Sequence, residues 1–481
     1  MSEATGDFVG RDRELAALAE SHDSAGSSFV PIYGRRRVGK SELILRFLRG
    51  RPAVYHVGKQ ASAGLQIREF LTEAAAVLGE PLLATFPADG WKAALEAVVA
   101  RFRGAGRDGG DPHTPGPAGK LVIVLDEFQW TAGASPELPS VLQELWDRSW
   151  RRSGKIMLIL CGSFIGFMER EVLGRGSPLF GRRTAQILLR PFDFREAARF
   201  HPSLSIVDRA KVYFLCGGVP LYLRAFSASA SIDTNLCRLL LDEYGPLHRE
   251  ADFLLREELR DVENYYAVLL ALSSGLGHNR DIARFTGIAD RSLHYYLKQL
   301  VDLGYLSTRY PLTAGKPAAR HVRYVLEDPL LRFWFRFVFP NTSYIAQMGA
   351  ARALADRIRP ELPAFFGAAF ERLCREALPV LYAEEGVTAA FRVGEYWDKH
   401  TQIDVVGLRD DGWTDLGECK WGAARSATTL SAELDKKVAS YPNPGHATIG
   451  RRFFTRDAVP GRQKKDAGER WYTLADLYGE G

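Results

Sequence analysis

Residues 27–48, SSFVPIYGRRRVGKSELILRFL, join a short apolar run, a glycine-containing loop and a leucine-rich segment. The run from Phe29 to Tyr33 has the composition of a buried strand, and the leucines after Lys40 recur at helical spacing. The loop between them, GRRRVGKS, fits the pattern GxxxxGK[ST], which binds phosphate groups when it lies between a strand and a helix. A chance Gly-rich turn is the weaker alternative because both flanks match. We therefore expect an α/β fold with a phosphate-binding loop.

Each residue of this loop has a physical role in the prediction. The glycines let backbone N–H groups approach the phosphates, and the start of the helix adds a partial positive charge. The Lys40 ammonium is expected to contact the β- and γ-phosphates, and the Ser41 hydroxyl to bind Mg²⁺. The predicted nucleotide contacts are Gly34, Arg35, Arg36, Arg37, Val38, Gly39, Lys40 and Ser41. The implied ligands are ATP and Mg²⁺.

A second strand supplies the acidic residue that such a loop requires. In LVIVLDEFQW, residues 121–130, the first five positions are wholly apolar, as in a buried parallel strand. Asp126 follows at the carboxyl end, where ligands bind in open α/β sheets. We expect Asp126 to lie on the Mg²⁺ side and Glu127 to polarise the attacking water.

Six segments in one order give a resemblance to a known family: FVGRDREL, GRRRVGKS, LVIVLDEFQW, LILCGS, SPLFGRRTAQILLRPF and CGGVPLYL. Together they resemble the archaeal-type P-loop ATPases of the STAND branch of the AAA-like superfamily. The resemblance implies that Gly10 and Arg11 lie against the adenine, that Ser163 is a polar sensor and that Pro220 lies near the nucleotide. Arg182 and Arg183 have two open interpretations, γ-phosphate arginines or solvated charges.

The middle of the chain reads as helices followed by a winged helix. Residues 191–260 have helical patterns and are predicted to form a lid, and residues 261–345 show three helices and two strands around a wing. The third helix carries Arg291, His294 and Lys298, and the wing carries Lys316, Arg320, His321 and Arg323. Basic residues at these places favour DNA binding, whereas the family resemblance favours an intramolecular lid. Both interpretations stay open.

The segment LGECKW, residues 416–421, carries an acid-x-lysine triplet that chance alone supplies in a chain of this composition. Its surroundings make it specific. TQIDVVGL and TDLGECKW have strand character and flank RDDGW, a hairpin signal. A hairpin centred on Asp411 puts Asp404 opposite Glu418. Side chains of a strand alternate between its two faces, so Lys420 lies on the same face as Glu418. Two carboxylates this close favour a bound cation such as Mg²⁺. Asp435-Lys436-Lys437 is a similar triplet, to which we assign no role.

The order of elements around this hairpin resembles the PD-(D/E)xK nuclease core. The resemblance makes Asp404 and Glu418 metal ligands, Lys420 the residue that orients or deprotonates water, and Glu371 an accessory metal acid. Ile403 stands where the family often has proline. Arg451, Arg452 and Arg456 on the next predicted strand weakly favour phosphate contact. The alternatives are an inactive fold that binds nucleic acid or a partner, and an exposed charged hairpin with no site.

Composition sets the remaining expectations. The chain has 481 residues, 25% of them charged, and a formal net charge of +5, which neither requires nor excludes nucleic acid. Five scattered cysteines without a CxxC pair favour a reducing compartment. No run reaches the ~20 apolar residues of a membrane helix. We therefore expect a cytoplasmic protein without membrane contact. Residues 103–120, rich in Gly and Pro, are predicted to form a loop.

The predicted architecture has four parts: a P-loop ATPase domain with a parallel sheet (1–190), a helical lid (191–260), a winged helix (261–345) and an α/β restriction-endonuclease-like domain (346–481). The predicted function is an ATPase switch whose last domain acts on or binds DNA or another nucleic acid. The alternatives are a nucleotide-binding regulator or scaffold with an inactive last domain, and a winged-helix DNA-binding regulator.

Overall fold

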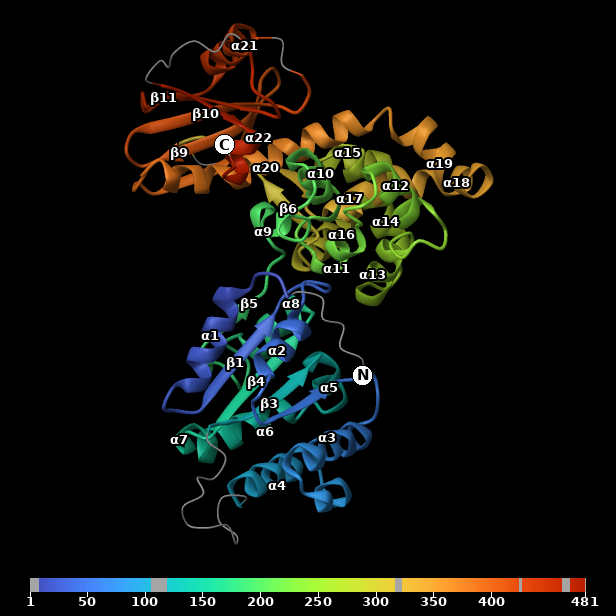
Figure 1. Ribbon diagram of the computed structural model, residues 1–481, viewed down its shortest axis with the longest axis vertical. Helices are drawn as coiled ribbons and strands as arrows, with labels where there is room; N and C mark the ends of the chain where they lie inside the picture. The colour runs from blue at the N-terminus through green and yellow to red at the C-terminus, as the bar shows by residue number, and fades with distance from the viewer. Residues whose placement is uncertain (1–7, 105–118, 316–321, 424–425, 461–467, 481) are drawn as a thin grey trace. The chain divides into compact units, whose positions relative to one another are not determined.

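The computed structural model describes residues 8–104, 119–315, 322–423, 426–460 and 468–480. The chain divides into two compact units, Met1–Pro191 and Phe192–Gly481 (Figure 1). Most of the predicted loop at 103–120 lies outside the described residues, as do Lys316, Arg320 and His321 of the predicted wing.

The first unit is built on a five-stranded parallel sheet with the strand order β2-β3-β4-β1-β5. Its strands are β1 (Ser28–Tyr33), β2 (Ala53–Val57), β3 (Leu121–Asp126), β4 (Ile156–Gly162) and β5 (Ile187–Leu188). Strands β1, β3 and β4 are buried along their whole length, as expected when helices cover both faces of a parallel sheet. The predicted parallel α/β sheet is confirmed.

Alternate residues of β3 face the two hydrophobic cores of this unit. Val122 and Val124 pack with α1 (Asp12–Asp23) and α2 (Lys40–Leu48) on one face. Leu121 and Ile123 belong to the core on the other face. That face is covered by α3 (Ala63–Leu78), α4 (Trp91–Gly104), α5 (Phe128–Ala134) and α6 (Leu138–Leu145). Shorter helical segments are η1 (Pro81–Thr85), η2 (Trp146–Trp150), α7 (Arg151–Ser153), α8 (Ile165–Phe167) and η3 (Met168–Val172).

The second unit begins with helices that share one large hydrophobic core. They are α9 (Phe194–Ala198), α10 (Ile206–Cys216), α11 (Pro220–Ala225), α12 (Ile232–Leu236), η4 (Cys237–Leu241) and α13 (Glu250–Glu258). Next come α14 (Val262–Ser273), α15 (Asn279–Thr286), α16 (Asp290–Asp302) and the antiparallel strands β6 (Leu306–Arg309) and β7 (Arg323–Leu326). The aromatic stretch after β7 is buried in this core. It forms α17 (Pro329–Phe333), η6 (Trp334–Val338), η7 (Phe339–Asn341) and α18 (Thr342–Met348), followed by α19 (Ala350–Ala353) and η8 (Leu354–Ile358).

The chain ends in a mixed five-stranded sheet with the order β12-β11-β10-β9-β8. Its strands are β8 (Phe391–Trp397), β9 (Gln402–Arg409), β10 (Trp413–Lys420), β11 (Thr448–Thr455) and β12 (Glu469–Thr473). Helix α20 (Leu362–Glu384) covers one face and α21 (Ala427–Ser440) the other (Figure 1). The last helix is α22 (Leu474–Tyr478).

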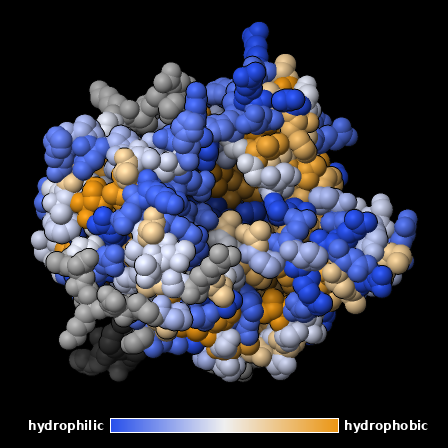
Figure 2. Space-filling view, turned by 90° about the horizontal axis from the view of Figure 1, so that it is seen from above, coloured by the Kyte–Doolittle hydropathy of each residue, from blue (hydrophilic) through white to orange (hydrophobic). Residues whose placement is uncertain are grey.

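Within the described ranges, no helix has the length and apolar composition needed to cross a membrane. On the face drawn in Figure 2, hydrophobic residues form separate patches among hydrophilic ones.

Candidate functional site

The loop from Gly34 to Ser41 joins the end of β1 to the start of α2. Its backbone enters the left-handed region at Arg37 (φ 69°) and Gly39 (φ 89°). Gly34 has a φ of 154°, and a Cβ atom there would lie 2.2 Å from the carbonyl oxygen of Leu189. Glycine is therefore required at position 34 by the close approach of another strand end as well as by the turn.

Lys40 lies inside this loop. The residue is 6% exposed, and its ammonium group donates to the carbonyl oxygens of Gly34 and Arg35, both at 2.9 Å. Burial lowers the pKa of Lys40, while the charges of Glu127 and Asp126 act in the opposite direction. A buried cation held by loop carbonyls is suited to anionic oxygens, which can replace those carbonyls as partners.

Ser41 and Asp126, each predicted to bind Mg²⁺, are in direct contact. The Ser41 hydroxyl donates to Asp126 Oδ2 over 2.7 Å, and the Tyr55 hydroxyl donates to the same oxygen over 2.5 Å. Asp126 is 2% exposed. A serine hydroxyl and an aspartate are the oxygen ligands that Mg²⁺ prefers, so the residues present fit a Mg–nucleotide complex. Burial and the neighbouring Asp126 charge raise the pKa of Tyr55, so it remains a neutral donor.

Glu127 is held by two residues of the neighbouring elements. Its carboxylate accepts a hydrogen bond of 2.8 Å from the Ser163 hydroxyl at the end of β4, and another from the Gln129 amide. The Gln129 amide is also 3.2 Å from the Ser163 hydroxyl. Glu127 itself has a left-handed backbone (φ 48°) at the start of α5. Backbone strain of this kind clusters at functional sites.

The other residues predicted to contact nucleotide lie in different surroundings. Arg11 is 6% exposed and donates to the carbonyl oxygens of Val38 and Arg190, at 3.2 and 2.7 Å. It therefore braces the back of the phosphate-binding loop, and Gly10 precedes it with a positive φ of 66°. Pro220 belongs to the second unit, where it is buried and begins α11.

Arg182 and Arg183 differ in their partners. The guanidinium of Arg182 makes a bidentate pair with Asp147, at 3.0 and 2.6 Å, and also donates to the carbonyl oxygens of Pro178 and Phe180. Arg183 is exposed. In this structure Arg182 is therefore engaged with the protein.

In the second unit, β9 and β10 pair in the predicted register. Thr414 lies opposite Leu408 and Gly417 opposite Val405, and the same register carried one residue further would put Glu418 opposite Asp404. The Cys419 N–H donates to Asp404 Oδ2 over 3.0 Å. The prediction that the hairpin centres on Asp411 is confirmed.

Glu418 is surrounded by ammonium groups. It is 4% exposed, and its two oxygens lie 2.9 Å from Lys420 Nζ and 2.5 Å from Lys437 Nζ. Lys437 comes from α21 and belongs to the triplet Asp435-Lys436-Lys437, to which we assigned no role. The sequence analysis therefore missed its direct contact with Glu418. Burial disfavours the charge of Lys420, but its bond to Glu418 outweighs burial and raises its pKa.

Asp404 and Glu371 have carboxyl groups that resist ionisation. Burial, followed by repulsion from Glu418, raises the pKa of Asp404 to about 6. Burial, followed by repulsion from Asp404, raises the pKa of Glu371 to about 8. Among the residues that the structure describes, however, no three His, Cys, Asp or Glu side chains group closely enough to hold a metal ion. The donor chemistry suits Mg²⁺, but in this conformation lysines take the places of a cation at Glu418.

Basic residues predicted to contact phosphate or DNA are partly engaged. On α16, Arg291, His294 and Lys298 are exposed, while the leucines of the opposite face are buried. Arg323 lies 4.3 Å from the ring centre of Trp397. The remaining three are on β11 and just after it: Arg452 pairs with Glu385 and Asp415, Arg451 with Asp435 and Arg456 with Asp457.

Sequence reasoning missed several residues that contact the candidate sites. Tyr55 and Gln129 bond the acids of the first unit, and Lys437 bonds Glu418. Arg375 on α20 donates to the Asp404 carbonyl oxygen over 2.6 Å. Only Gln129, two residues after Glu127, carried a usable signal, because it shares the motif with the acids.

Comparison with known proteins finds similarity to two families and to one relative. Residues 8–226 match the model of a family described as an ATPase domain predominantly from Archaea. Residues 334–432 match a family described as archaeal and bacterial proteins of unknown function. An uncharacterized protein of Methanocaldococcus jannaschii is 28% identical over 418 residues, which span 86% of this chain and 87% of the relative.

Solved structures show similarity in fold. A Walker-type ATPase of Pyrococcus abyssi aligns with a TM-score of 0.51 at 17% identity, over 68% of this chain and 96% of that one. The ORC2 protein of Aeropyrum pernix aligns with a TM-score of 0.41 at 15% identity, over 71% of this chain and 97% of that one. The phosphate-binding loop, the acid at the end of β3 and the match over residues 8–226 all support a P-loop ATPase in the N-terminal part of the chain.

Proposed function

We propose that the protein is an ATP-driven switch in which the first unit binds and hydrolyses Mg·ATP and the second unit binds nucleic acid in response. The observation that carries the first part is the contact between the Ser41 hydroxyl and Asp126 beneath a complete phosphate-binding loop. When bound, Mg²⁺ would supply positive charge that offsets the charge developing on the phosphates. Ser41 and Asp126 would hold it there.

The chain's own residues supply the remaining chemistry in this proposal. Lys40 neutralises phosphate oxygens from within the loop, and Arg11 keeps the loop in shape through the Val38 carbonyl. Glu127 accepts a proton from the attacking water, and its bond to Ser163 fixes the carboxylate orientation. Ser163 lies at the end of β4 and bonds Glu127. In this proposal it is the residue that senses the loss of the phosphate.

ATP turnover tests this part. Lys40→Ala removes the cation at the phosphates, and we expect steady-state hydrolysis to fall on the order of 10²–10³-fold. Lys155→Ala, an exposed lysine of the same unit, is the matched control and should hydrolyse ATP at the wild-type rate. Hydrolysis that survives Lys40→Ala would contradict the assignment of the phosphate-binding loop.

For the second unit we assign α14, α15, α16, β6 and β7 to a winged helix and residues 346–481 to a nuclease-like domain. Support comes from the order of the helices and strands and from the confirmed hairpin register of β9 and β10. The two lysines on Glu418 favour a domain that binds phosphates without cutting them. We propose binding as its function for this reason.

Metal-dependent cleavage of a phosphodiester is the second candidate. It is favoured by Asp404 and Glu418 on neighbouring strands with Lys420 beside them. A plasmid-cleavage assay with Mg²⁺ or Mn²⁺, with and without ATP, separates the candidates. Cleavage that disappears in Lys420→Ala supports the nuclease. Nucleic-acid binding without cleavage under every condition supports the binding function.

A further inference from the structure

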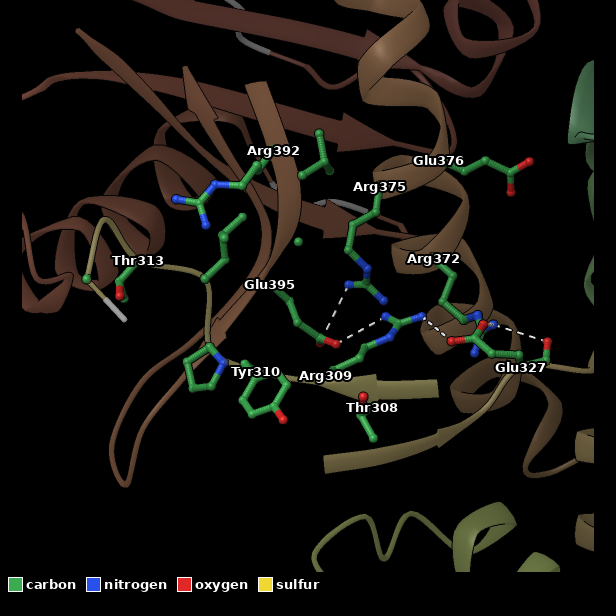
Figure 3. Close-up of a pocket in the computed structure, with 15 residues that line it drawn as sticks. Thr308, Arg309, Tyr310, Thr313, Glu327, Arg372, Arg375, Glu376, Arg392 and Glu395 are labelled. Atoms are coloured by element: carbon green, nitrogen blue, oxygen red, sulfur yellow. Dashed lines mark hydrogen bonds and ion pairs between the residues drawn. The ribbon is translucent and has the colours of Figure 1, made fainter. Parts of the chain in front are cut away.

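A pocket of about 570 Å³ lies in the second unit, where three elements meet (Figure 3). It is lined by β6 and the residues that follow it (308–313 and 315), by α20 and by β8. The Leu312 N–H donates to the Glu395 carbonyl oxygen over 2.8 Å, and the Tyr441 hydroxyl donates to the Leu312 carbonyl oxygen over 3.0 Å. These bonds hold one pocket wall against the edge strand of the sheet.

Arginines outnumber acids in the pocket wall. Arg309 bonds both Glu327 and Glu395, at 2.9 and 3.2 Å. Arg372 bonds Glu327, and Arg375 lies 3.7 Å from Glu395. Three guanidinium groups thus share two carboxylates, as the chain of dashed lines in Figure 3 shows. Arg375 is also attracted to the carboxyl groups of Asp404 and Glu371 outside the lining.

Glu376, the third acid of the lining, adds little to the balance. It accepts hydrogen bonds from the Tyr213 hydroxyl at 2.8 and 3.0 Å, and in Figure 3 it points away from the arginine network. Burial raises the pKa of Glu376 to about 7, so part of its population is neutral near neutral pH. The pocket therefore favours an anion.

Arg392 adds a further positive charge at the rim. It is exposed on β8 and forms no hydrogen bond or ion pair with any residue that the structure describes. The same pocket is lined by the hydroxyl groups of Thr308 and Thr313 and by the ring of Tyr310, which is 41% exposed; Figure 3 draws Tyr310 and Thr308 on the other side of Glu395 from Arg392. A free guanidinium, hydroxyl donors and an open aromatic ring are the groups by which proteins hold unpaired nucleotides.

We propose that this pocket binds a short unpaired stretch of a nucleic-acid strand, with a phosphate at Arg392 and a base against Tyr310. The volume lies within the roughly 300–1,000 Å³ of small-ligand sites, which suits a nucleotide and excludes a base-paired helix. The pocket adjoins the candidate acids through Arg375, which donates to the Asp404 carbonyl oxygen. This inference rests on the proposed nucleic-acid binding and names the form of the ligand.

Equilibrium binding of fluorescent 12-nucleotide single strands of DNA and RNA, and of the matching duplex, tests it on the full chain. Tyr310→Ala should weaken single-strand binding roughly 5- to 150-fold, the range of one lost base stack, while Tyr310→Phe keeps the affinity. Arg392→Ala should weaken it and reduce the slope of log affinity against log salt by about 0.7, one phosphate contact. Duplex binding should change little in each variant.

Arg470→Ala is the matched control, because Arg470 is an exposed arginine on β12, at the opposite edge of the same sheet. It should bind single strands like the wild type. Equal losses in Arg470→Ala and Arg392→Ala would overturn the proposal and indicate a diffuse charge effect. A free mononucleotide that binds as tightly as the strand would also overturn it.

The outcomes separate the pocket assignment from the proposed nucleic-acid binding on which it rests. If the wild-type protein binds no nucleic acid at all, the proposed function fails and the pocket assignment with it. If the wild type binds single strands and the Tyr310 and Arg392 variants bind them equally well, the proposed function stands and only the pocket assignment fails. The readout is binding, so it does not depend on whether the domain cuts.

Discussion

Two buried carboxylates at the ends of sheet strands, Asp126 and Glu418, have opposite partners. Asp126 accepts hydrogen bonds from the hydroxyl groups of Ser41 and Tyr55, which carry no charge, and the Lys40 ammonium interacts with it without a direct bond. Glu418 accepts from the ammonium groups of Lys420 and Lys437, which neutralise it. A carboxylate with neutral donors attracts a cation, whereas one with two cations has less need of a metal. The neighbours of an acid therefore decide its chemistry.

The largest expected effect concerns the first unit, at Glu127 beside Asp126. Glu127→Gln keeps the shape of the side chain but cannot take a proton, so ATP hydrolysis should fall about 10²–10⁴-fold. Nucleotide binding should persist because the phosphate-binding loop is untouched. Single-turnover hydrolysis and nucleotide titration measure the two effects. Glu137→Gln, an exposed glutamate of the same unit, is the control. Wild-type turnover in Glu127→Gln would remove Glu127 from the chemistry.

Carboxylates balanced by arginines should make the second unit sensitive to acid. Burial opposes the charge of Glu327, but Arg372 and Arg309 outweigh it and lower its pKa to about 2. A folded-state pKa below the unfolded value stabilises the fold above the unfolded pKa, and this stability is lost as pH falls toward 2. The full effect is about 3 kcal/mol. Urea unfolding between pH 6 and 3 should show this loss, and Glu327→Gln should flatten it. An unchanged pH slope would show that Glu327 is not the group that titrates.

Removing one lysine should make Glu418 resemble Asp126. Lys437→Met leaves Glu418 with Lys420 alone, at a cost of about 1–3 kcal/mol for a hydrogen bond to a charged group. Mn²⁺ should then stabilise the variant, by about 2.7 kcal/mol at a concentration 100 times its Kd, and stabilise the wild type less. Thermal unfolding with and without Mn²⁺ measures both. Lys436→Met, an exposed neighbour on α21, is the control.

A second substitution identifies the ligand in that experiment. Adding Glu418→Gln to Lys437→Met should abolish the effect of Mn²⁺. If the double variant still responds to the metal, Glu418 does not bind it.

The same contrast explains what the sequence could predict. The loop from Gly34 to Ser41 and the register of the β9–β10 hairpin depend on residues close in the chain, so strand periodicity and turn signals were enough. Lys437 and Tyr55 reach the acids from elements that only the fold brings near, and no local pattern marks them. Strands β8 and β12 were missed as well. Both are edge strands of the last sheet with partly exposed residues, so their composition is weakly apolar.

The smallest expected effect concerns Arg182, whose role the sequence left open. Its bidentate pair with Asp147 and its bonds to two carbonyl oxygens already use the guanidinium. Arg182→Ala should therefore leave ATP turnover within about 2-fold and cost about 0–1 kcal/mol, as for other exposed pairs. A γ-phosphate arginine would instead contribute on the order of 10³–10⁵-fold to turnover. Parallel assays of Arg182→Ala, Arg183→Ala and Asp147→Ala decide this. A large loss of turnover in Arg182→Ala, with none in Asp147→Ala, would mean that Arg182 leaves Asp147 for the phosphate when ATP binds. The first unit would then also rely on the Arg182 guanidinium, which in this structure is bonded to Asp147.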